Sequence, residues 1–438
     1  MNKSLYIVAF SLAFATTGIA QNNEGQDKTV DLGTQTTTEL RKTQAVSTIY
    51  SDELDKNATT SPYNAIYGLL PGLTVMQNTS WGTDKSRLNV RGRGSLNGDT
   101  PLFVVDGFAR PIEYINLSEI ESISVLKDGA ATALWGGRGA NGVVLITTKR
   151  GMYSKKEIKV DYKFGLGLPV NQPEFADAYT YAKARNEALR YDGLQPDMDE
   201  ASFLAGGNSD LYPNVDWQKE ALRNHTTSHQ LDITFRGGGK RLRYFSVLNY
   251  KNDMGLLNSK YTDYTDRYNS QMKKYFLNLR MNLDVDITDA TKLKLNMLGM
   301  LRETKRPTTS EATLFEQIFN TPSAAFPVQT QNGLWGSNNV LKTNPIANLA
   351  DVGYYKLNQR MLQADLRLIQ DLSVLTRGLS AELAIAYDNN ATYQETAKKS
   401  FMYQTIEKGT DGEPVYTNYG NPNDELEISN KGLANQYI

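Results

Sequence analysis

The stretch from Ile120 to Gly151 reads IESISVLKDGAATALWGGRGANGVVLITTKRG and decides the fold of the first part of the chain. Its first apolar segment ends at Lys127-Asp128-Gly129, a turn signal, and the alanine-rich run 130–135 then predicts one or two helical turns. Several glycines break this helix before the β-branched strand 143–148. The sequence therefore predicts a small α/β unit whose turns bring backbone segments close together.

Four short motifs lie in and before this unit. They are Arg-Gly-Arg-Gly at 91–94, Val-Asp-Gly at 105–107, Val-Leu-Lys-Asp at 125–128 and Gly-Gly-Arg-Gly-Ala-Asn-Gly-Val at 136–143. In this order and spacing they resemble the plug domain of TonB-dependent outer-membrane transporters, specifically the SusC/RagA group. The resemblance implies active uptake of large nutrients through a plugged β-barrel, without covalent chemistry. Its motif residues are Arg91, Gly92, Arg93, Gly94, Asp106, Gly107, Lys127, Asp128, Gly136, Arg138, Gly139, Asn141 and Gly142.

The glycines at 137, 139 and 142 also match the dinucleotide-binding fingerprint. That fingerprint needs a strand before the glycines and a helix after them, so that the helix N-terminus meets the pyrophosphate. Here a helical segment comes first and a strand follows. The order of elements therefore argues against a nucleotide site.

Composition limits the classes of function. The 438 residues contain 47 Lys and Arg against 48 Asp and Glu, which gives no electrostatic case for nucleic acid as a partner. The absence of cysteine removes disulfides, thiolate metal sites and cysteine catalysis. The 25 tyrosines suit membrane-interface belts or sugar-facing surfaces, although an ordinary β-protein uses tyrosine as well.

The N-terminus has the pattern of a secretory signal over residues 1–20. Lys3 is followed by the apolar run 5–15 and by Gly18-Ile19-Ala20, a small-residue cleavage site. Residues 21–39 are polar and predict a mobile linker. The resemblance implies a TonB box in this linker, and an ordinary linker is the alternative. The β-prone patch chosen for the box is Thr29, Val30, Asp31, Leu32 and Gly33.

A plug is expected over 40–151, and the first part of an antiparallel transmembrane barrel with long external loops over 152–438. In 274–287 odd positions are apolar and even positions are polar apart from Phe276. An Arg at the bilayer midplane costs about 2–4 kcal/mol, so the odd positions should face lipid. Long and short joins alternate between the predicted strands, as in outer-membrane barrels. These strands are 157–168, 230–236, 241–251, 274–287, 292–302, 360–370 and 378–388.

Within the plug, the loop 77–86 carries Trp81, a possible ligand contact whose alternative role is to anchor packing. In the first external loop, Pro173 to Gly193 predicts a helix and Trp217 a buried side chain at a turn. A polar network should hold the plug against the barrel wall, because charges buried there must be paired. Its expected members are Arg91, Arg93, Asp106, Lys127, Asp128 and Arg138.

Catalytic signals are weak. His225 and His229 are four residues apart, but no neighbouring Glu and no third ligand complete a zinc site. A calcium loop built from Asp192, Asp197 and Asp199 has no further support. No enzyme activity, metal or cofactor is therefore expected.

The end of the chain is the main difficulty. Residues 388–438 are polar and predict loops without a final amphipathic strand, and seven strands would leave two unpaired edges in lipid. The chain is therefore expected to be an N-terminal fragment of a longer transporter. The resemblance implies TonB, a SusD-like surface lipoprotein, outer-membrane lipid and an oligosaccharide or peptide substrate as partners. A secreted carbohydrate-binding β-protein is the alternative.

Overall fold

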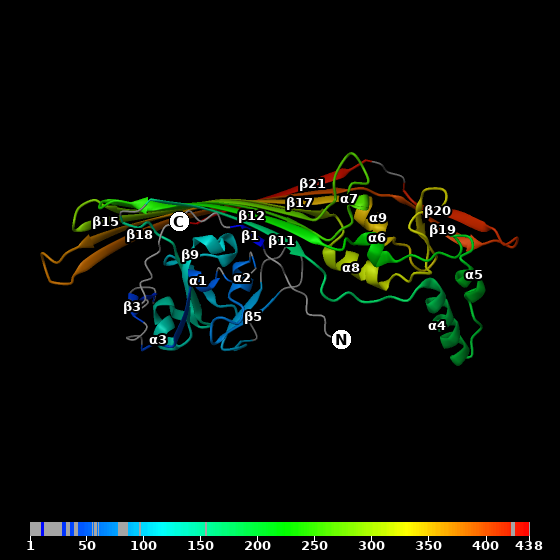
Figure 1. The fold of residues 1–438 in the computed structure, drawn as a ribbon, viewed down its shortest axis with the longest axis horizontal. Coiled ribbons are helices and arrows are strands. Elements are labelled where there is room, and N and C mark those ends of the chain that lie inside the picture. Colours follow the sequence, from blue (N-terminus) through cyan, green and yellow to red (C-terminus); the bar gives the residue numbers. More distant parts are fainter. Residues whose placement is uncertain are drawn as a thin grey trace.

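A computed structural model describes residues 10–12, 29–31, 36–38, 43–54, 56, 59, 61–77, 86–95, 98–153, 156–421 and 425–437. Figure 1 shows a long curved sheet, a small α/β domain against one of its faces, and a group of helices and short strands toward one end. No helix in the described ranges is both long and apolar enough to cross a membrane.

The small domain corresponds to the expected plug and is called the plug below. Its five-stranded sheet has the order β4 (Val46–Tyr50), β9 (Ile120–Leu126), β10 (Val143–Thr148), β7 (Leu102–Val105) and β8 (Phe108–Ala109). Only β10 and β7 pair in parallel within this sheet. A hairpin joins β5 (Leu73–Met76) and β6 (Arg87–Val90), and β2 (Thr29–Asp31) pairs with β3 (Thr36–Thr38).

Short helices connect the strands of the plug. They are α1 (Ser51–Leu54), α2 (Pro62–Ala65), α3 (Gly129–Thr132) and the 3-10 turns η1 (Ile112–Tyr114), η2 (Leu117–Glu119) and η3 (Ala133–Gly139). The helix expected over 130–135 is therefore divided. The α-helical part ends at Thr132, and Gly136 kinks the turn that follows with a φ of +52°.

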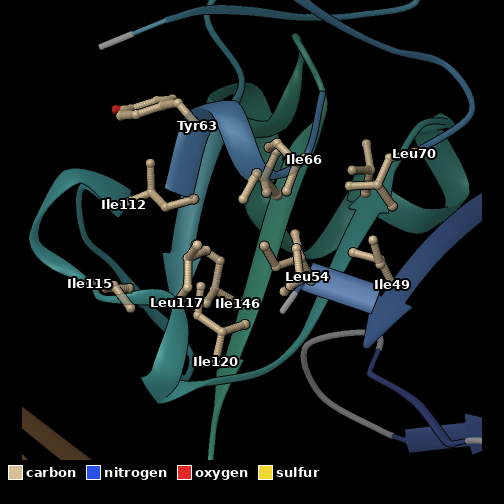
Figure 2. Close-up of a cluster of buried hydrophobic side chains, with 14 of the residues drawn as sticks. Ile49, Leu54, Tyr63, Ile66, Leu70, Ile112, Ile115, Leu117, Ile120 and Ile146 are labelled. Carbon is tan, nitrogen blue, oxygen red and sulfur yellow. The ribbon is translucent and has the colours of Figure 1, made fainter. Parts of the chain in front are cut away.

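The plug has an apolar core of its own. Ile49 from β4, Ile123 from β9 and Ile146 from β10 are almost fully buried in it, and helical residues cover them (Figure 2). β10 reads as an almost continuous β-branched run, VVLITT, because residues on both of its faces are buried. The plug is thus a packed domain whose stability comes from apolar burial.

The long sheet has nine strands in the order β1-β11-β12-β13-β14-β15-β17-β18-β21. Its edge strands β1 and β21 are not paired with each other in the described residues, so the sheet is open. β1 lies inside the predicted signal segment and pairs with β11 over three residues. The strands are β1 (Phe10–Leu12), β11 (Glu157–Gly167), β12 (Thr226–Gly238), β13 (Leu242–Met254), β14 (Lys273–Asp286), β15 (Thr291–Pro307), β17 (Gly353–Asp371), β18 (Ser380–Lys398) and β21 (Glu427–Tyr437).

As predicted, alternation along the strands gives this sheet one face toward the plug and one exposed apolar face. In β14 the even positions 274–284 are buried on the side of the plug, whereas Leu277 and Leu279 on the other face are 40% and 48% exposed. In β11, Ile158, Val160 and Tyr162 are exposed in the same way. The sequence therefore predicted correctly which side chains face away from the plug.

The segments at one end of the sheet form a second apolar core. Trp217 is 3% exposed, as predicted, and its Nε1 donates to the carbonyl of Pro322 at 3.1 Å. Ile318 and Phe326 pack in the same core. The elements of these segments are α4 (Ala178–Tyr191), α5 (Glu200–Ala205), α6 (Trp217–Ala221), α7 (Ser259–Thr262), α8 (Glu311–Asn320), α9 (Pro345–Ala350), β16 (Trp335–Ser337), β19 (Met402–Lys408) and β20 (Pro414–Gly420).

The prediction of loops over 388–438 was wrong. β18 continues to Lys398, β19 and β20 form a hairpin beside β16, and β21 returns to pair with β18. These strands lack apolar alternation, and every residue of β21 is exposed. Main-chain pairing rather than side-chain burial holds β21 in place, which is why a pattern of apolar residues could not reveal it.

Candidate functional site

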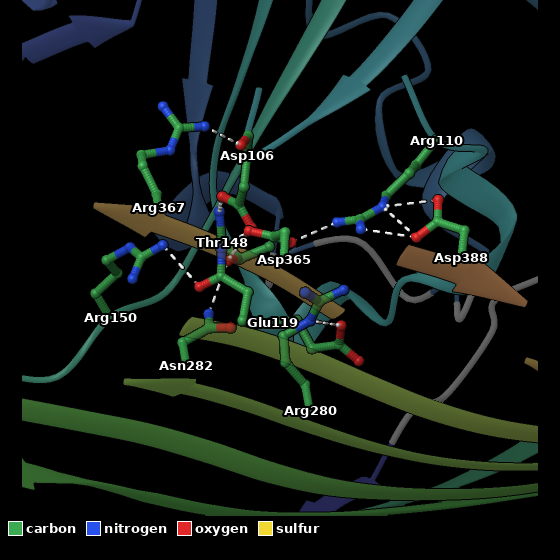
Figure 3. Close-up of polar contacts among 11 residues, drawn as sticks. Asp106, Arg110, Glu119, Thr148, Arg150, Arg280, Asn282, Asp365, Arg367 and Asp388 are labelled. Carbon is green, nitrogen blue, oxygen red and sulfur yellow. Dashed lines mark hydrogen bonds and ion pairs between the residues drawn. The ribbon is translucent and has the colours of Figure 1, made fainter. Parts of the chain in front are cut away.

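The strongest contact between plug and sheet is made by Arg110, which directly follows β8. Its guanidinium donates to Asp365 of β17 at 2.6 Å and to Asp388 of β18 at 2.7 Å (Figure 3). The Arg110 side chain is only 3% exposed. Burial alone would lower the pKa of Arg110, but the hydrogen bonds to the two carboxylates raise it overall. The guanidinium therefore remains charged and bridges two neighbouring strands.

A second ion pair lies deeper in the contact. Glu119 ends the turn η2, where its Oε1 accepts from the backbone of Asn116 in a capping box. Its other oxygen, Oε2, accepts from Nε of Arg280 on β14 at 2.6 Å, and both side chains are at most 2% exposed. Burial raises the pKa of Glu119, and the Arg280 charge opposes that rise. Removing either partner would leave a buried charge unpaired.

The end of β10 makes the third contact. Nδ2 of Asn282 donates at 2.8 Å both to Oγ1 of Thr148 and to the carbonyl of Lys149. Two residues on, Arg150 donates to Asp284 at 2.8 Å. Asn282 and Asp284 are even-numbered residues of β14, on the face that the alternation placed toward the interior.

The fourth contact explains the Val-Asp-Gly motif. Asp106 adopts a φ of +48°, and its carboxylate accepts from the backbone N–H and the hydroxyl of Thr148 at 3.0 and 2.6 Å. Its carbonyl accepts from Arg367 of β17 at 2.9 Å. Gly107 has a φ of +92°, and a Cβ there would lie 2.5 Å from Nη2 of Arg367. The motif therefore supplies a tight turn that the sheet can approach closely.

Of the six residues expected in this polar network, only Asp106 has a contact with the sheet in the described part of the chain. Arg93 binds Asp99 at 3.2 Å within the plug. Lys127 donates to Ser47 at 2.6 Å, and Asp128 caps α3 and accepts from the backbone of Ala45. Arg91 and Arg138 are exposed. Three of the six charges, Arg93, Lys127 and Asp128, thus brace the plug internally, and the expectation that they hold the plug against the barrel wall was wrong.

The motif glycines and Asn141 also act within the plug. Gly92 and Gly142 have φ values of +84° and +89°, which disfavour any residue with a Cβ. A Cβ on Gly142 would lie 2.8 Å from Val90. Asn141 donates to the carbonyl of Gly98 at 3.2 Å. Gly142 and Asn141 of the last motif therefore lie against the segment 90–98, which contains the first motif.

Comparison with known proteins agrees with this architecture. Residues 38–143 match the family model described as the TonB-dependent Receptor Plug Domain. The TonB-dependent receptor SusC of Bacteroides thetaiotaomicron is 30% identical over 255 residues, which cover 55% of this chain and 24% of that protein. TonB-dependent receptor P26 of Formosa agariphila is 28% identical over 281 residues, or 62% of this chain and 26% of that protein.

The solved structure of the RagAB peptide importer in its open-open state matches 93% of this chain and 53% of that chain, with a TM-score of 0.69 and 18% identity. The chain resembles TonB-dependent receptors of the SusC/RagA type. It spans about a quarter of the length of the curated relatives it matches. The likeness to RagAB concerns the fold, and in this chain a plug is followed by antiparallel strands in an open sheet.

The other candidate residues are placed only in part. Trp81, Leu32 and Gly33 lie outside the described residues. The rest of the candidate TonB box, Thr29–Asp31, forms β2, and Val30 is fully buried in a small core with Val46 and Leu126.

Three of the other polar candidates, His229, Asp197 and Asp199, have structural partners. Nδ1 of His229 lies 2.7 Å from the Tyr162 hydroxyl, and His225 is exposed. Asp197 pairs with Arg185, and Asp199 caps α5. Among the described residues no group of three or more His, Cys, Asp or Glu is arranged to hold a metal ion.

Sequence reasoning missed Arg110, Glu119 and Arg150 as the plug side of the contact. No local pattern distinguishes these residues from surface charges. The sheet side carried a signal, because Arg280, Asn282 and Asp284 are polar residues on a face predicted to point inward. Their partners depend on how the plug sits against the sheet, which spacing along the chain does not encode.

Proposed function

We propose that this chain forms the plug and part of the barrel wall of a TonB-dependent importer in the outer membrane, which it reaches through the signal 1–20. The importer takes up a large nutrient, a glycan or a peptide, with a SusD-like surface lipoprotein as partner. TonB pulls on the segment Thr29–Gly33, and the plug then rearranges. The relatives and the fold support this proposal.

The observation that carries the proposal is the chemistry of the plug–sheet contact. Four plug residues, Asp106, Arg110, Glu119 and Arg150, bind polar side chains of the sheet. Polar groups exchange protein partners for water at modest net cost, about 0.5–1.5 kcal/mol for an ordinary hydrogen bond. A plug held in this way can leave the wall and return without exposing an apolar core.

The apolar outer face of the sheet opposes the alternative of a secreted soluble protein. Ile158 of β11 is 67% exposed, and Leu383 and Ile385 of β18 are 60% and 54% exposed on the same face of the sheet. Soluble monomers rarely expose contiguous apolar surface on this scale, whereas lipid covers it in a barrel.

The test uses the absence of cysteine, since one introduced thiol is then the sole reactive thiol of the chain. Ser118 accepts from Asn249 of β13 at 2.8 Å, so a Ser118→Cys thiol becomes accessible when the plug leaves the sheet. Ser124 is 1% exposed and bonds to Thr48 inside the plug, so a Ser124→Cys thiol reports unfolding of the plug itself.

Cells given a mixed peptide and oligosaccharide extract are labelled with maleimide, with and without TonB. We expect faster labelling of the Ser118→Cys variant when TonB is present, and a much smaller change for Ser124→Cys. Labelling of Ser118→Cys that does not depend on TonB would contradict the mechanism. Recovery of the protein as a soluble periplasmic monomer would overturn the location.

A further inference from the structure

A half-enclosed cavity of about 150 Å³ lies where three segments outside the long sheet meet. The segments connect β11 to β12, β15 to β17, and β18 to β21. Figure 1 shows α5, β19 and β20 beyond the end of the sheet, away from the plug. The cavity is therefore separate from the plug–sheet contact.

The cavity contains a buried carboxylate without a basic partner. Asp210 is 4% exposed, and its Oδ2 accepts from the Tyr416 hydroxyl at 2.7 Å and from the backbone N–H of Gln331 at 3.0 Å. No Lys or Arg forms an ion pair with Asp210 among the described residues. Burial and the bond to Asp210 raise the pKa of Tyr416 to about 12, which keeps the phenol protonated as a donor.

Two further polar side chains line the cavity. Ser337 is 1% exposed, and its hydroxyl has no hydrogen-bond partner in the described part of the structure. Such a group costs about 1–3 kcal/mol unless something satisfies it. Nζ of Lys408 donates to the Tyr212 hydroxyl at 2.8 Å and is 3.8 Å from Asp199. The cavity thus presents one carboxylate, one ammonium and one unsatisfied hydroxyl.

The rest of the lining is apolar or aromatic, including Leu211, Phe326, Ile406 and the ring of Tyr212. A cavity of about 150 Å³ is large enough for one six-membered ring. Because one positive and one negative side chain line it, a neutral ligand fits better than a charged one. A ring with apolar C–H faces and hydroxyl groups at its edge matches both kinds of lining.

We propose that this cavity binds one neutral sugar ring of an oligosaccharide and so joins three outer segments of the chain. The inference rests on the proposed import function and decides between its two substrate classes.

The test is saturation-transfer NMR on the natural protein purified from outer membranes in detergent. The probes are the methyl glycosides of glucose, galactose, mannose and xylose, with tetra-alanine as the peptide. We expect at least one glycoside to bind and tetra-alanine not to bind. Binding of tetra-alanine alone, or of no glycoside, would overturn the proposal.

Substitutions in the cavity then test whether the glycoside binds there. Asp210→Asn should weaken glycoside binding about tenfold, the effect of losing a charge-assisted hydrogen bond. Ser337→Ala should weaken it severalfold while leaving the melting temperature unchanged or higher, because the native hydroxyl has no partner. If Asp210→Asn does not fold, the glycoside affinity of Ser337→Ala tests the proposal. Native affinity in the folded variants would overturn the assignment.

The control is Ser270→Ala, a buried serine outside the cavity whose hydroxyl bonds to the carbonyl of Leu349 at 2.8 Å. It should lower stability and leave glycoside binding as it was. Binding in detergent needs no TonB, so a failure here leaves the import proposal standing. If TonB-dependent labelling fails, the glycoside-binding measurement still decides whether this cavity binds a sugar.

Discussion

The core of the plug and the contact between plug and sheet are both buried, yet they are made of opposite chemistry. Ile49, Ile123 and Ile146 fill the core, where apolar packing excludes water. The contact with the sheet is dominated by Arg110, Glu119 and their charged or amide partners. One small apolar patch, in which Tyr114 meets Phe276, is the exception.

This difference shows which surface is suited to separate. Exposing the core would return apolar surface to water at about 25 cal/mol per Å². Separating the polar contact exchanges ion pairs and hydrogen bonds for hydration, and a buried ion pair contributes little net stability once its desolvation is counted. The plug is thus built to persist as a domain while its attachment remains exchangeable.

The largest expected effect is on the attachment. Arg280→Met leaves the carboxylate of Glu119 buried without its charged partner, a change that costs about 3–5 kcal/mol. Labelling of a Ser118→Cys thiol in the same protein should become much faster, with little change for Ser124→Cys. The double variant Arg280→Met, Glu119→Gln should recover much of the loss. Equal acceleration at both thiols would break the distinction between core and contact.

A substitution in the core should affect the inside of the plug rather than its attachment to the sheet. Ile123 is fully buried, and Ile123→Ala removes apolar contacts and leaves a cavity at a cost of about 2–5 kcal/mol. Hydrogen exchange of the backbone amides in β9 and β10 should rise, and the Ser124→Cys thiol should be exposed together with them. Unchanged exchange in these strands would show that the core is not the stabilising part of the plug.

A smaller effect is expected at the turn that touches Arg367. Gly107→Ala places a Cβ at a φ of +92° and 2.5 Å from the guanidinium, so we expect a loss of about 1–3 kcal/mol. Gly137→Ala is the matched control, because a Cβ there meets no atom within 4 Å. The urea concentration at the midpoint of plug unfolding is measured for both variants. Equal midpoints would contradict a constraint on the turn.

The smallest effect concerns acid stability. Backbone N–H groups of Ala45 and Ala131 hold the pKa of Asp128 below its usual range. A carboxyl with a lowered folded-state pKa stabilises the plug above its unfolded value, near pH 3.9, and this contribution is lost as pH falls through the folded pKa. Asp128→Asn should therefore flatten the loss of plug stability below about pH 4. A pH profile identical to that of the native protein would argue against this role.

Much of the fold could be predicted from the sequence, whereas only one side of the contact could. The alternation in β14 identified its interior face, and Asp106-Gly107 marked a turn that the structure confirms. The strand β21 was missed because it has no apolar pattern. The expected network named motif charges such as Arg93 and Lys127, which bind within the plug.

The features that could be predicted from the sequence have local causes. Side chains alternate across a strand with a period of two, and glycine marks the backbone conformations that other residues avoid, so both leave a trace in the order of residues. The ion pairs were decided by the tertiary structure. Arg110 is 255 residues from Asp365 and 278 from Asp388, and they meet only because β17 and β18 are adjacent and the plug lies against them. Which buried charges neutralise one another depends on that placement.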